Sequence, residues 1–276
     1  MAGTPADMRL GGSIRPQGRA RTVPGGYRID GRWDFASGIH YARWVQCPCV
    51  IDGGPRVRTM WIPAESMRII DTWTVVGLRG TGSHDFEVHD VFVPDAFSTS
   101  LADPPRQAGA LYRARFFLTW LWTVTVANSF GIARGAIDTF TQVAAQKAST
   151  SSTALLRDRP TVQAKIAQAE ATLQSSRTYV IDTIGRLWSL VSAGETDLDR
   201  PFMQARLAIT HGMHEAVRAV DAVYHAAGTN AVYAANAIER PFRDIHVCVQ
   251  HGAALPQHFE SAGKVLMGLR PTDPGW

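Results

Sequence analysis

The chain has 276 residues, 45% of them hydrophobic, and its 28 Lys and Arg slightly outnumber its 24 Asp and Glu. This length suffices for one large or two modest domains with apolar cores, and the apolar content excludes an intrinsically disordered chain. Because the basic residues form no run, we expect no binding of nucleic acid.

Cysteine usage and the apolar segments indicate the compartment. Cys47, Cys49 and Cys248 are too few and too scattered for a disulfide framework. A single residue separates Cys47 from Cys49 and no second pair exists, so we expect no zinc site. The polar N-terminus lacks the apolar core of a signal peptide. Residues 116–133 are uncharged but contain several Thr, Ser and Asn, which favours a buried helix over a membrane span. We therefore predict a cytoplasmic protein.

The first part of the chain, from about residue 25 to residue 94, has the pattern of short strands. Apolar and polar side chains alternate over residues 27–35, and Asp30-Gly31 in their midst predicts a hairpin turn. Residues 44–51 and 57–63 form two further apolar runs, separated by Gly and Pro. Short strands without intervening helices predict a small antiparallel barrel or sandwich.

A glycine-rich stretch, V-V-G-L-R-G-T-G-S, begins at Val75 and invites comparison with a phosphate loop. Such a loop needs a following helix whose N-terminus meets the anion. Residues 86–93 instead alternate apolar and polar side chains, which predicts a strand. A phosphate loop is therefore excluded, and the glycines are expected to shape a tight loop between strands.

The second part of the chain changes period after a connector at residues 95–109. Long, Ala-rich segments low in Gly and Pro predict the helices of a bundle. We expect a β-domain at 1–105 and a C-terminal helical bundle of the four-helix type at 106–276, which is an α+β fold. The expected helices are 116–146, 161–192, 202–224 and a last one after Pro256.

Three motifs in this order carry a family resemblance. They are G-G-Y-R-I-D-G-R-W-D-F-A-S-G (residues 25–38), G-L-R-G-T-G-S-H-D-F-E-V-H-D-V-F-V-P (77–94) and R-P-F-R-D-I-H-V-C-V-Q-H-G (240–252). The chain resembles the acyl-CoA dehydrogenase superfamily, and most closely its two-component flavin-dependent monooxygenases. That resemblance implies an oxygenase component that hydroxylates an aromatic or polyketide-like substrate through a flavin C4a-hydroperoxide. It also implies reduced FMN or FAD from a separate flavin reductase, and a homotetramer.

The resemblance leaves two alternatives open. Members of the family begin with an N-terminal helical domain, whereas this sequence starts almost directly at the β-domain. The chain can therefore also be read as a non-catalytic truncated homologue or a partner subunit. The other alternative is an FAD-dependent enzyme of the acyl-CoA dehydrogenase type. There a glutamate removes the substrate's α-proton, and the matching position here is His251.

The resemblance implies a flavin contact at Trp33, Phe35 and Ser37. The matching family segment lies against the flavin ring, with an aromatic side chain packed on it and a hydroxyl near its reactive nitrogen. A flat apolar wall with one hydroxyl donor excludes water and hydrogen-bonds the flavin. The pattern alone equally describes a core aromatic residue followed by a turn serine. Arg243 either contacts the flavin phosphate or pairs with neighbouring charges, and such pairing is the commoner arrangement.

The resemblance implies that His251 is the base that acts on a phenolic or similar substrate hydroxyl. An imidazole suits this task because its pKa lies near neutral. The alternative is a histidine in a surface loop. Arg79, Thr81 and Ser83 of the glycine-rich stretch are expected to face the flavin or the substrate.

Other polar residues carry weaker expectations. His211, His214 and Glu215 lie close together on a predicted helix, but no inward carboxylate partner is evident, so we predict no metal site. Nothing in the sequence assigns a role to His246. Residues 224–231 match a glycine-rich dinucleotide segment of the family with most glycines lost, which favours FMN or a transiently held flavin over tightly bound FAD.

Overall fold

The computed structural model describes residues 8–148 and 153–271. The chain divides into two compact units, which we call the β unit and the helical unit. The β unit comprises Met1–Val75 and Arg79–Pro104, and the helical unit comprises Val76–Leu78 and Pro105–Trp276.

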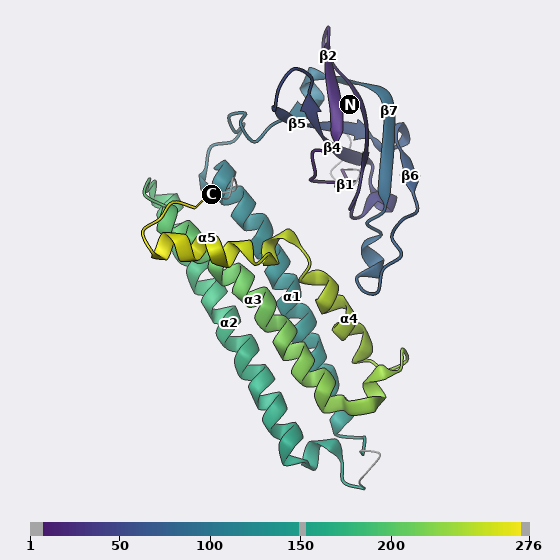
Figure 1. Cartoon of the computed structure of the whole chain (residues 1–276), viewed down its shortest axis with the longest axis vertical. Coiled ribbons are helices and arrows are strands. Elements are labelled where there is room, and N and C mark those ends of the chain that lie inside the picture. The colour runs from purple at the N-terminus through teal and green to yellow at the C-terminus, as the bar shows by residue number, and fades with distance from the viewer. Residues whose placement is uncertain (1–7, 149–152, 272–276) are drawn as a thin grey trace. The chain divides into compact units, whose positions relative to one another are not determined.

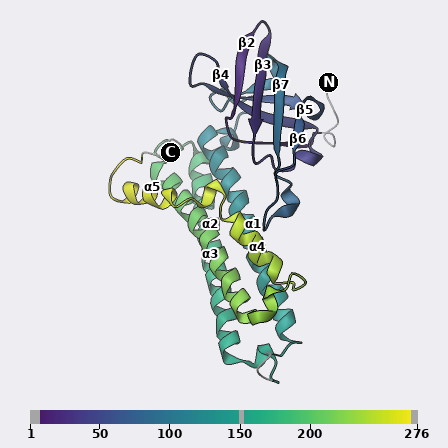
Figure 2. The same ribbon diagram turned by 45° about the vertical axis from the view of Figure 1, so that its right-hand side comes forward.

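The β unit contains an eight-stranded sheet with the path β6-β7-β3-β2-β4-β5-β8, and β1 pairs with β4 (Figures 1 and 2). Most neighbours are antiparallel, but β1 and β2 both pair with β4 in parallel, so the sheet is mixed. Trp33, Ile29, Phe86 and other fully buried side chains form its core. The strands are β1 (Leu10–Gly12), β2 (Gly18–Val23), β3 (Gly26–Trp33), β4 (Trp44–Ile51), β5 (Val57–Pro63), β6 (Arg68–Ile70), β7 (Asp85–Pro94) and β8 (Ser98–Thr99).

The hairpin turn predicted at Asp30-Gly31 is wrong, because both residues lie inside β3. The turn occurs earlier, between β2 and β3, where Val23 pairs with Gly26. Gly31 serves packing instead, since a Cβ there would lie 2.7 Å from the Cα of Gly18. The β3–β7 register also shifts between Ile29 and Gly31. Gly31 is thus needed because two backbones approach closely, and in the sequence such a glycine looks the same as a turn glycine.

The helical unit consists of three long helices that run side by side, with two shorter ones packed against them (Figures 1 and 2). Pro160 starts α2 at a position where its missing N–H costs nothing, and Gly194 ends it with a φ of 84°. Gly212 lets two helices approach, because a Cβ there would lie 2.8 Å from the Phe130 ring. The helices are α1 (Ala114–Ala144), α2 (Pro160–Ala193), α3 (Asp199–Ala227), α4 (Glu239–Cys248) and α5 (Gln257–Leu266).

The predicted α+β class and the order of a β-domain before a helical bundle are confirmed. The sequence did not predict α4, whose ten residues follow the irregular segment after α3. Among the helices of the described residues, none combines the length and apolarity needed to cross a bilayer.

The segment Val76–Leu78 belongs to the helical unit and lies on α4. The Leu78 N–H donates to Asp244 Oδ1 at 2.6 Å, and the Arg243 guanidinium donates to the Val76 carbonyl. Gly77 is required here, because a Cβ would lie 2.3 Å from the Arg243 carbonyl oxygen. The first glycine of the glycine-rich stretch therefore allows close contact between backbones.

Candidate active site

Three hydroxyl side chains of the β unit form a continuous hydrogen-bonded group, which we call the hydroxyl cluster: Ser37, Thr81 and Ser83. The Ser83 Oγ lies 2.8 Å from the Ser37 Oγ and 2.8 Å from the Thr81 Oγ1. Ser83 is buried and Ser37 is exposed. A backbone bond from the Gly38 N–H to the Thr81 carbonyl joins the two segments. The cluster thus presents an outer hydroxyl backed by a buried one.

Phe35 lies two residues before Ser37 and has a strained backbone. Its φ is 53°, in the left-handed region that non-glycine residues rarely adopt. The residue is nonetheless 52% exposed. The Arg15 guanidinium lies 4.5 Å from the ring centroid, and the Trp73 ring meets the Phe35 ring edge-on at 5.9 Å. Strain that holds an apolar ring at the surface marks a candidate binding position.

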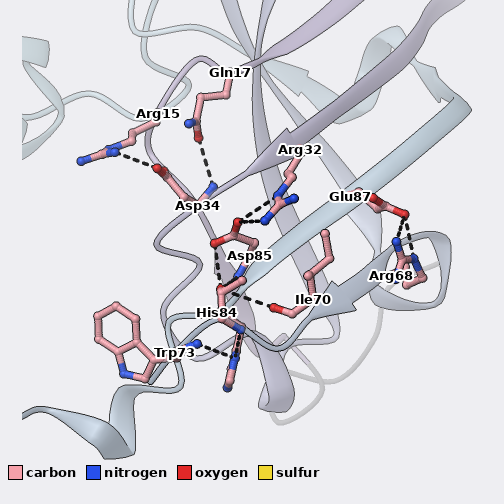
Figure 3. Close-up of polar contacts among 11 residues, drawn as sticks. Arg15, Gln17, Arg32, Asp34, Arg68, Ile70, Trp73, His84, Asp85 and Glu87 are labelled. Atoms are coloured by element: carbon pink, nitrogen blue, oxygen red, sulfur yellow. Dashed lines mark hydrogen bonds and ion pairs between the residues drawn. The ribbon is translucent and has the colours of Figure 1, made fainter. Parts of the chain in front are cut away.

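The segment before the glycine-rich stretch is fixed by His84 (Figure 3). The His84 Nδ1 accepts hydrogen bonds from the N–H groups of Thr72 and Trp73 at 3.2 and 3.1 Å. Asp71 Oδ1 also lies 3.1 Å from this nitrogen. Because two N–H donors point at Nδ1, the nitrogen carries no proton, and we read the Asp71 contact as proximity and not as an ion pair. His84 thereby places Trp73 beside Phe35.

Charged pairs lie around this region (Figure 3). Arg32 donates two hydrogen bonds to Asp85, and Arg15 pairs with Asp34 at 2.8 Å. Arg79, which the sequence assigned to the flavin or the substrate, donates to the Val75 carbonyl at 2.9 Å and lies exposed. Its bond stabilises its own loop, whereas Thr81 and Ser83 meet Ser37.

Trp33 has a structural position that differs from the flavin contact implied by the resemblance. The residue is fully buried, and its ring stacks on Phe86 with centroids 5.0 Å apart. Its Nε1–H donates to the Pro48 carbonyl at 2.8 Å. Since no part of the ring reaches the surface, Trp33 is a core residue of the β unit.

In the helical unit, His251 follows α4 and begins a short loop. Its Nδ1 accepts a hydrogen bond from the Ala253 N–H at 3.1 Å, so His251 caps the 3-10 helix Gly252–Ala254. The residue is exposed, yet protein atoms around the ring desolvate it and lower the pKa of His251. The direction agrees with the cap, because a proton on Nδ1 would break that bond. His251 is therefore an accessible, neutral imidazole at neutral pH.

Three consecutive carbonyls of this loop each accept a hydrogen bond from a side chain. The His258 Nε2 lies 2.7 Å from the Gly252 oxygen, and the Thr210 Oγ1 lies 2.8 Å from the Ala253 oxygen. The His214 Nε2 lies 2.9 Å from the Ala254 oxygen. We call residues 251–254 the His251 loop, and Thr210, His214 and His258 the carbonyl clamp.

The remaining predicted residues of the helical unit form local pairs. Arg243 makes an ion pair with Glu239 as well as its bond to the Val76 carbonyl, and Arg240 lies 3.4 Å from Asp244. His246 Nε2 lies 3.0 Å from Asp221 Oδ1. His211, at 3.8 Å from Glu215, does not join His214 in a ligand set. No group of three potential metal ligands occurs in the described part of the chain.

Four residues around these sites escaped prediction: Trp73, His84, Thr210 and His258. Trp73 and His84 flank the glycine-rich stretch, and their aromatic character was the available signal. Thr210 and His258 lie on helices and contact the loop 43 and 6 residues away. Only the folded arrangement brings Thr210 and His258 to neighbouring carbonyls of this loop, those of Ala253 and Gly252.

Comparison with known proteins gives a consistent result. Residues 123–256 match the family described as acyl-CoA dehydrogenase, C-terminal domain. The chain is 31% identical over 277 residues to indole-3-acetate monooxygenase of Pseudomonas putida, covering 99% of this chain and 71% of that protein. It is 27% identical to the FADH(2)-dependent resorcinol hydroxylase, oxygenase component, of Rhizobium sp. (strain MTP-10005), covering 96% and 70%.

The fold agrees with these relatives. The crystal structure of 3-HSA hydroxylase from Rhodococcus sp. RHA1 superposes with a TM-score of 0.87 at 28% identity, covering 99% of this chain and 73% of that chain. XiaF from Streptomyces sp., solved with FADH2 and glycerol, superposes with a TM-score of 0.86 at 22% identity, covering 96% and 70%. The chain belongs to the flavin-dependent monooxygenases built on the acyl-CoA dehydrogenase fold.

Proposed function

We propose that this chain is the oxygenase component of a two-component monooxygenase that hydroxylates an aromatic or polyketide-like substrate. Its relatives include proteins named for indole-3-acetate and for resorcinol, both aromatic compounds. The observation that carries the proposal is the strained, exposed Phe35 two residues from the outer hydroxyl of the hydroxyl cluster. This pairing of a flat apolar surface with a hydroxyl suits a flavin ring, which has an apolar face and a polar edge.

The residues of the β unit fit a flavin in part. Phe35 offers the apolar ring and Ser37 an exposed hydroxyl, whereas Trp33 is buried and takes no part. Arg243 of the helical unit is occupied by Glu239 and the Val76 carbonyl, so we do not assign it to a flavin phosphate. A bound reduced flavin supplies the two electrons with which one atom of O2 enters a substrate C–H bond and the other becomes water.

His251 is proposed to favour the ionised form of a substrate hydroxyl. Ionising a phenol raises the electron density on the ring carbon that accepts the oxygen atom. A histidine can do this by taking the proton or by donating a hydrogen bond to the oxygen anion. The role of base implied by the resemblance requires a free accepting nitrogen, and Nδ1 already accepts from Ala253.

The supply of flavin is also a proposal. A separate reductase would deliver reduced flavin that is held weakly, with FMN or FAD both accepted. Cys47, Cys49 and Cys248 are all free thiols, which is compatible with a reducing cytoplasm. A homotetramer remains a prediction that light scattering on the purified protein can measure.

The test of the reaction uses chemically reduced FMN or FAD, isotopically labelled O2 and a panel that includes indole-3-acetate and resorcinol. We expect one labelled oxygen atom in a hydroxylated product. If the flavin is oxidised and only hydrogen peroxide forms with every aromatic compound, the proposed reaction is wrong. That result would favour a non-catalytic homologue or partner subunit.

The test of the flavin position measures anaerobic binding of reduced flavin. Phe35→Ala should weaken binding about tenfold through loss of the exposed ring. Phe92→Ala is the matched control, because Phe92 is also an exposed aromatic residue of the β unit, at 45% exposure. Equal affinities of the two variants would contradict the assignment of Phe35.

A further inference from the structure

The carbonyl clamp determines the hydrogen-bonding direction of the whole His251 loop. A carbonyl oxygen can only accept, so the Nε2 atoms of His258 and His214 must both carry a proton in their contacts with Gly252 and Ala254. The Thr210 hydroxyl must likewise donate its hydrogen to the Ala253 carbonyl oxygen. The donors of all three bonds are therefore fixed.

The clamp lies mostly away from solvent. Thr210 is 1% exposed and His258 is 5% exposed. Water therefore cannot readily replace these donors, and a buried carbonyl that loses its partner is costly. Buried side chains thus hold the main chain of a loop whose first residue, His251, is exposed.

The loop in turn fixes the tautomer of His251. The Ala253 N–H donates to Nδ1, so in the neutral ring the proton lies on Nε2. Desolvation lowers the pKa of His251 and keeps the ring neutral near pH 7. The nitrogen that is left to meet a ligand is thus an N–H donor.

We propose that Thr210, His214 and His258 are positioning residues that hold His251 as a hydrogen-bond donor through Nε2. Building on the proposed monooxygenase function, the Nε2–H of His251 stabilises the anionic oxygen of the bound substrate. The hydroxyl proton of the substrate leaves to water, and His251 changes neither charge nor tautomer. His251 thus acts on the substrate as a donor and not as a base.

The first experiment measures the clamp without any activity. Amide hydrogen exchange is followed at Ala253 and Ala254, whose N–H groups bond to His251. Thr210→Val keeps the side-chain shape but removes the donor, and we expect about tenfold faster exchange at these amides. Thr210→Ser restores a hydroxyl and should return exchange close to the wild-type rate.

Thr183→Val is the matched control for this measurement. Thr183 is also buried in a long helix, but its hydroxyl donates to the Tyr179 carbonyl of its own helix at 2.6 Å. The loop amides should exchange at the wild-type rate in this variant. If Thr210→Val and Thr183→Val give the same loop exchange, the clamp does not hold the loop. His214→Leu and His214→Gln repeat the comparison, because glutamine retains an N–H donor.

The second experiment separates a donor from a base. His251→Gln retains both an acceptor for Ala253 and an N–H donor, but it cannot take up a proton near neutral pH. We expect His251→Gln to keep hydroxylation within about tenfold of wild type, and His251→Ala to lose about a hundredfold or more. If both variants fall equally while the Ala253 and Ala254 amides of His251→Gln exchange normally, His251 is a base and the donor role is wrong.

The two experiments also separate this inference from the proposed function. A wild-type protein that forms no hydroxylated product would overturn the monooxygenase proposal and with it the donor role. The exchange rates of Thr210→Val would still decide whether the clamp positions His251.

Discussion

The hydroxyl cluster of the β unit and the His251 loop of the helical unit are held by different kinds of hydrogen bond. In the cluster, Ser37, Thr81 and Ser83 bond through side-chain hydroxyls, and either oxygen of each pair can be the donor. In the loop, the acceptors are main-chain carbonyls and each donor is fixed. The cluster can reverse its direction when a ligand needs a donor or an acceptor, whereas the loop cannot.

This difference indicates separate tasks. A hydroxyl that can rotate suits a partner whose protonation changes during a reaction. An imidazole with a fixed tautomer suits an oxygen atom whose charge must be stabilised throughout.

Removing the exposed His251 side chain should slow hydroxylation more than removing the exposed Ser37 hydroxyl. His251→Ala should lower the rate of product formation about a hundredfold or more, because its contribution is electrostatic and directional. Ser37→Ala should lower the rate about tenfold, since Ser83 and a water molecule can replace part of the hydroxyl's bonding. Single-turnover product formation with reduced flavin measures both. A larger loss in Ser37→Ala would reverse the assignment of tasks.

Removing the buried donor His258 of the carbonyl clamp should lower the free energy of unfolding. His258→Leu leaves the Gly252 carbonyl without the donor that the buried His258 side chain supplies, and we expect a loss of about 1–3 kcal/mol in the free energy of unfolding. Urea denaturation measures the loss. His225→Leu is the control, because His225 is an exposed residue at the end of α3. Equal stabilities of the two variants would show that the Gly252 bond contributes nothing.

Removing the inner group of the hydroxyl cluster should cost less. Ser83→Ala breaks both bonds of the cluster, but Ser37 remains exposed and can bond to water. We expect a loss of about 1 kcal/mol by urea denaturation, and a smaller loss for Ser37→Ala. A loss in Ser83→Ala above that of His258→Leu would contradict the view that the cluster is the adaptable region.

The smallest expected effect is a pH dependence of stability that arises from His251. The pKa of His251 in the folded chain lies below its unfolded value of about 6.5. As the pH falls through about 6.5, the unfolded chain therefore takes up a proton first, and the folded state loses stability until the pH reaches the lower, folded pKa. Urea midpoints should fall more between about pH 7.5 and about pH 5.5 for wild type than for His251→Gln. Parallel declines would show that His251 is not the group responsible.

The sequence predicted the parts of this molecule that depend on local pattern. The runs at residues 44–51 and 57–63 are strands with those bounds, because alternating side chains and flanking Gly and Pro define them locally. The α+β class and the family were also predicted correctly. The turn prediction at Asp30-Gly31 was wrong because Gly31 is required by its close contact with Gly18 on the neighbouring strand β2, which the local pattern does not reveal.

The candidate sites were predictable only at their outer residues. Ser37, Thr81 and Ser83 were proposed separately from motifs, and their contact with one another needed the structure. The clamp was not predicted, because Thr210 and His214 belong to α3 and reach carbonyls about 40 residues away. The spacing of His211 and His214 on one helix could suggest metal ligands, and the sequence predicts no metal site there. The proton of His214 is instead directed to a carbonyl.

The docking of Val76–Leu78 on α4 limits how the chain can be divided into fragments. A helical fragment that begins at Pro105 would lack the Val76 carbonyl and the Leu78 N–H, which are partners of Arg243 and Asp244. These two residues lie in α4, the helix that leads directly into the His251 loop. A fragment suited to study of the loop therefore has to carry these three residues, for example joined by a short linker ahead of Pro105.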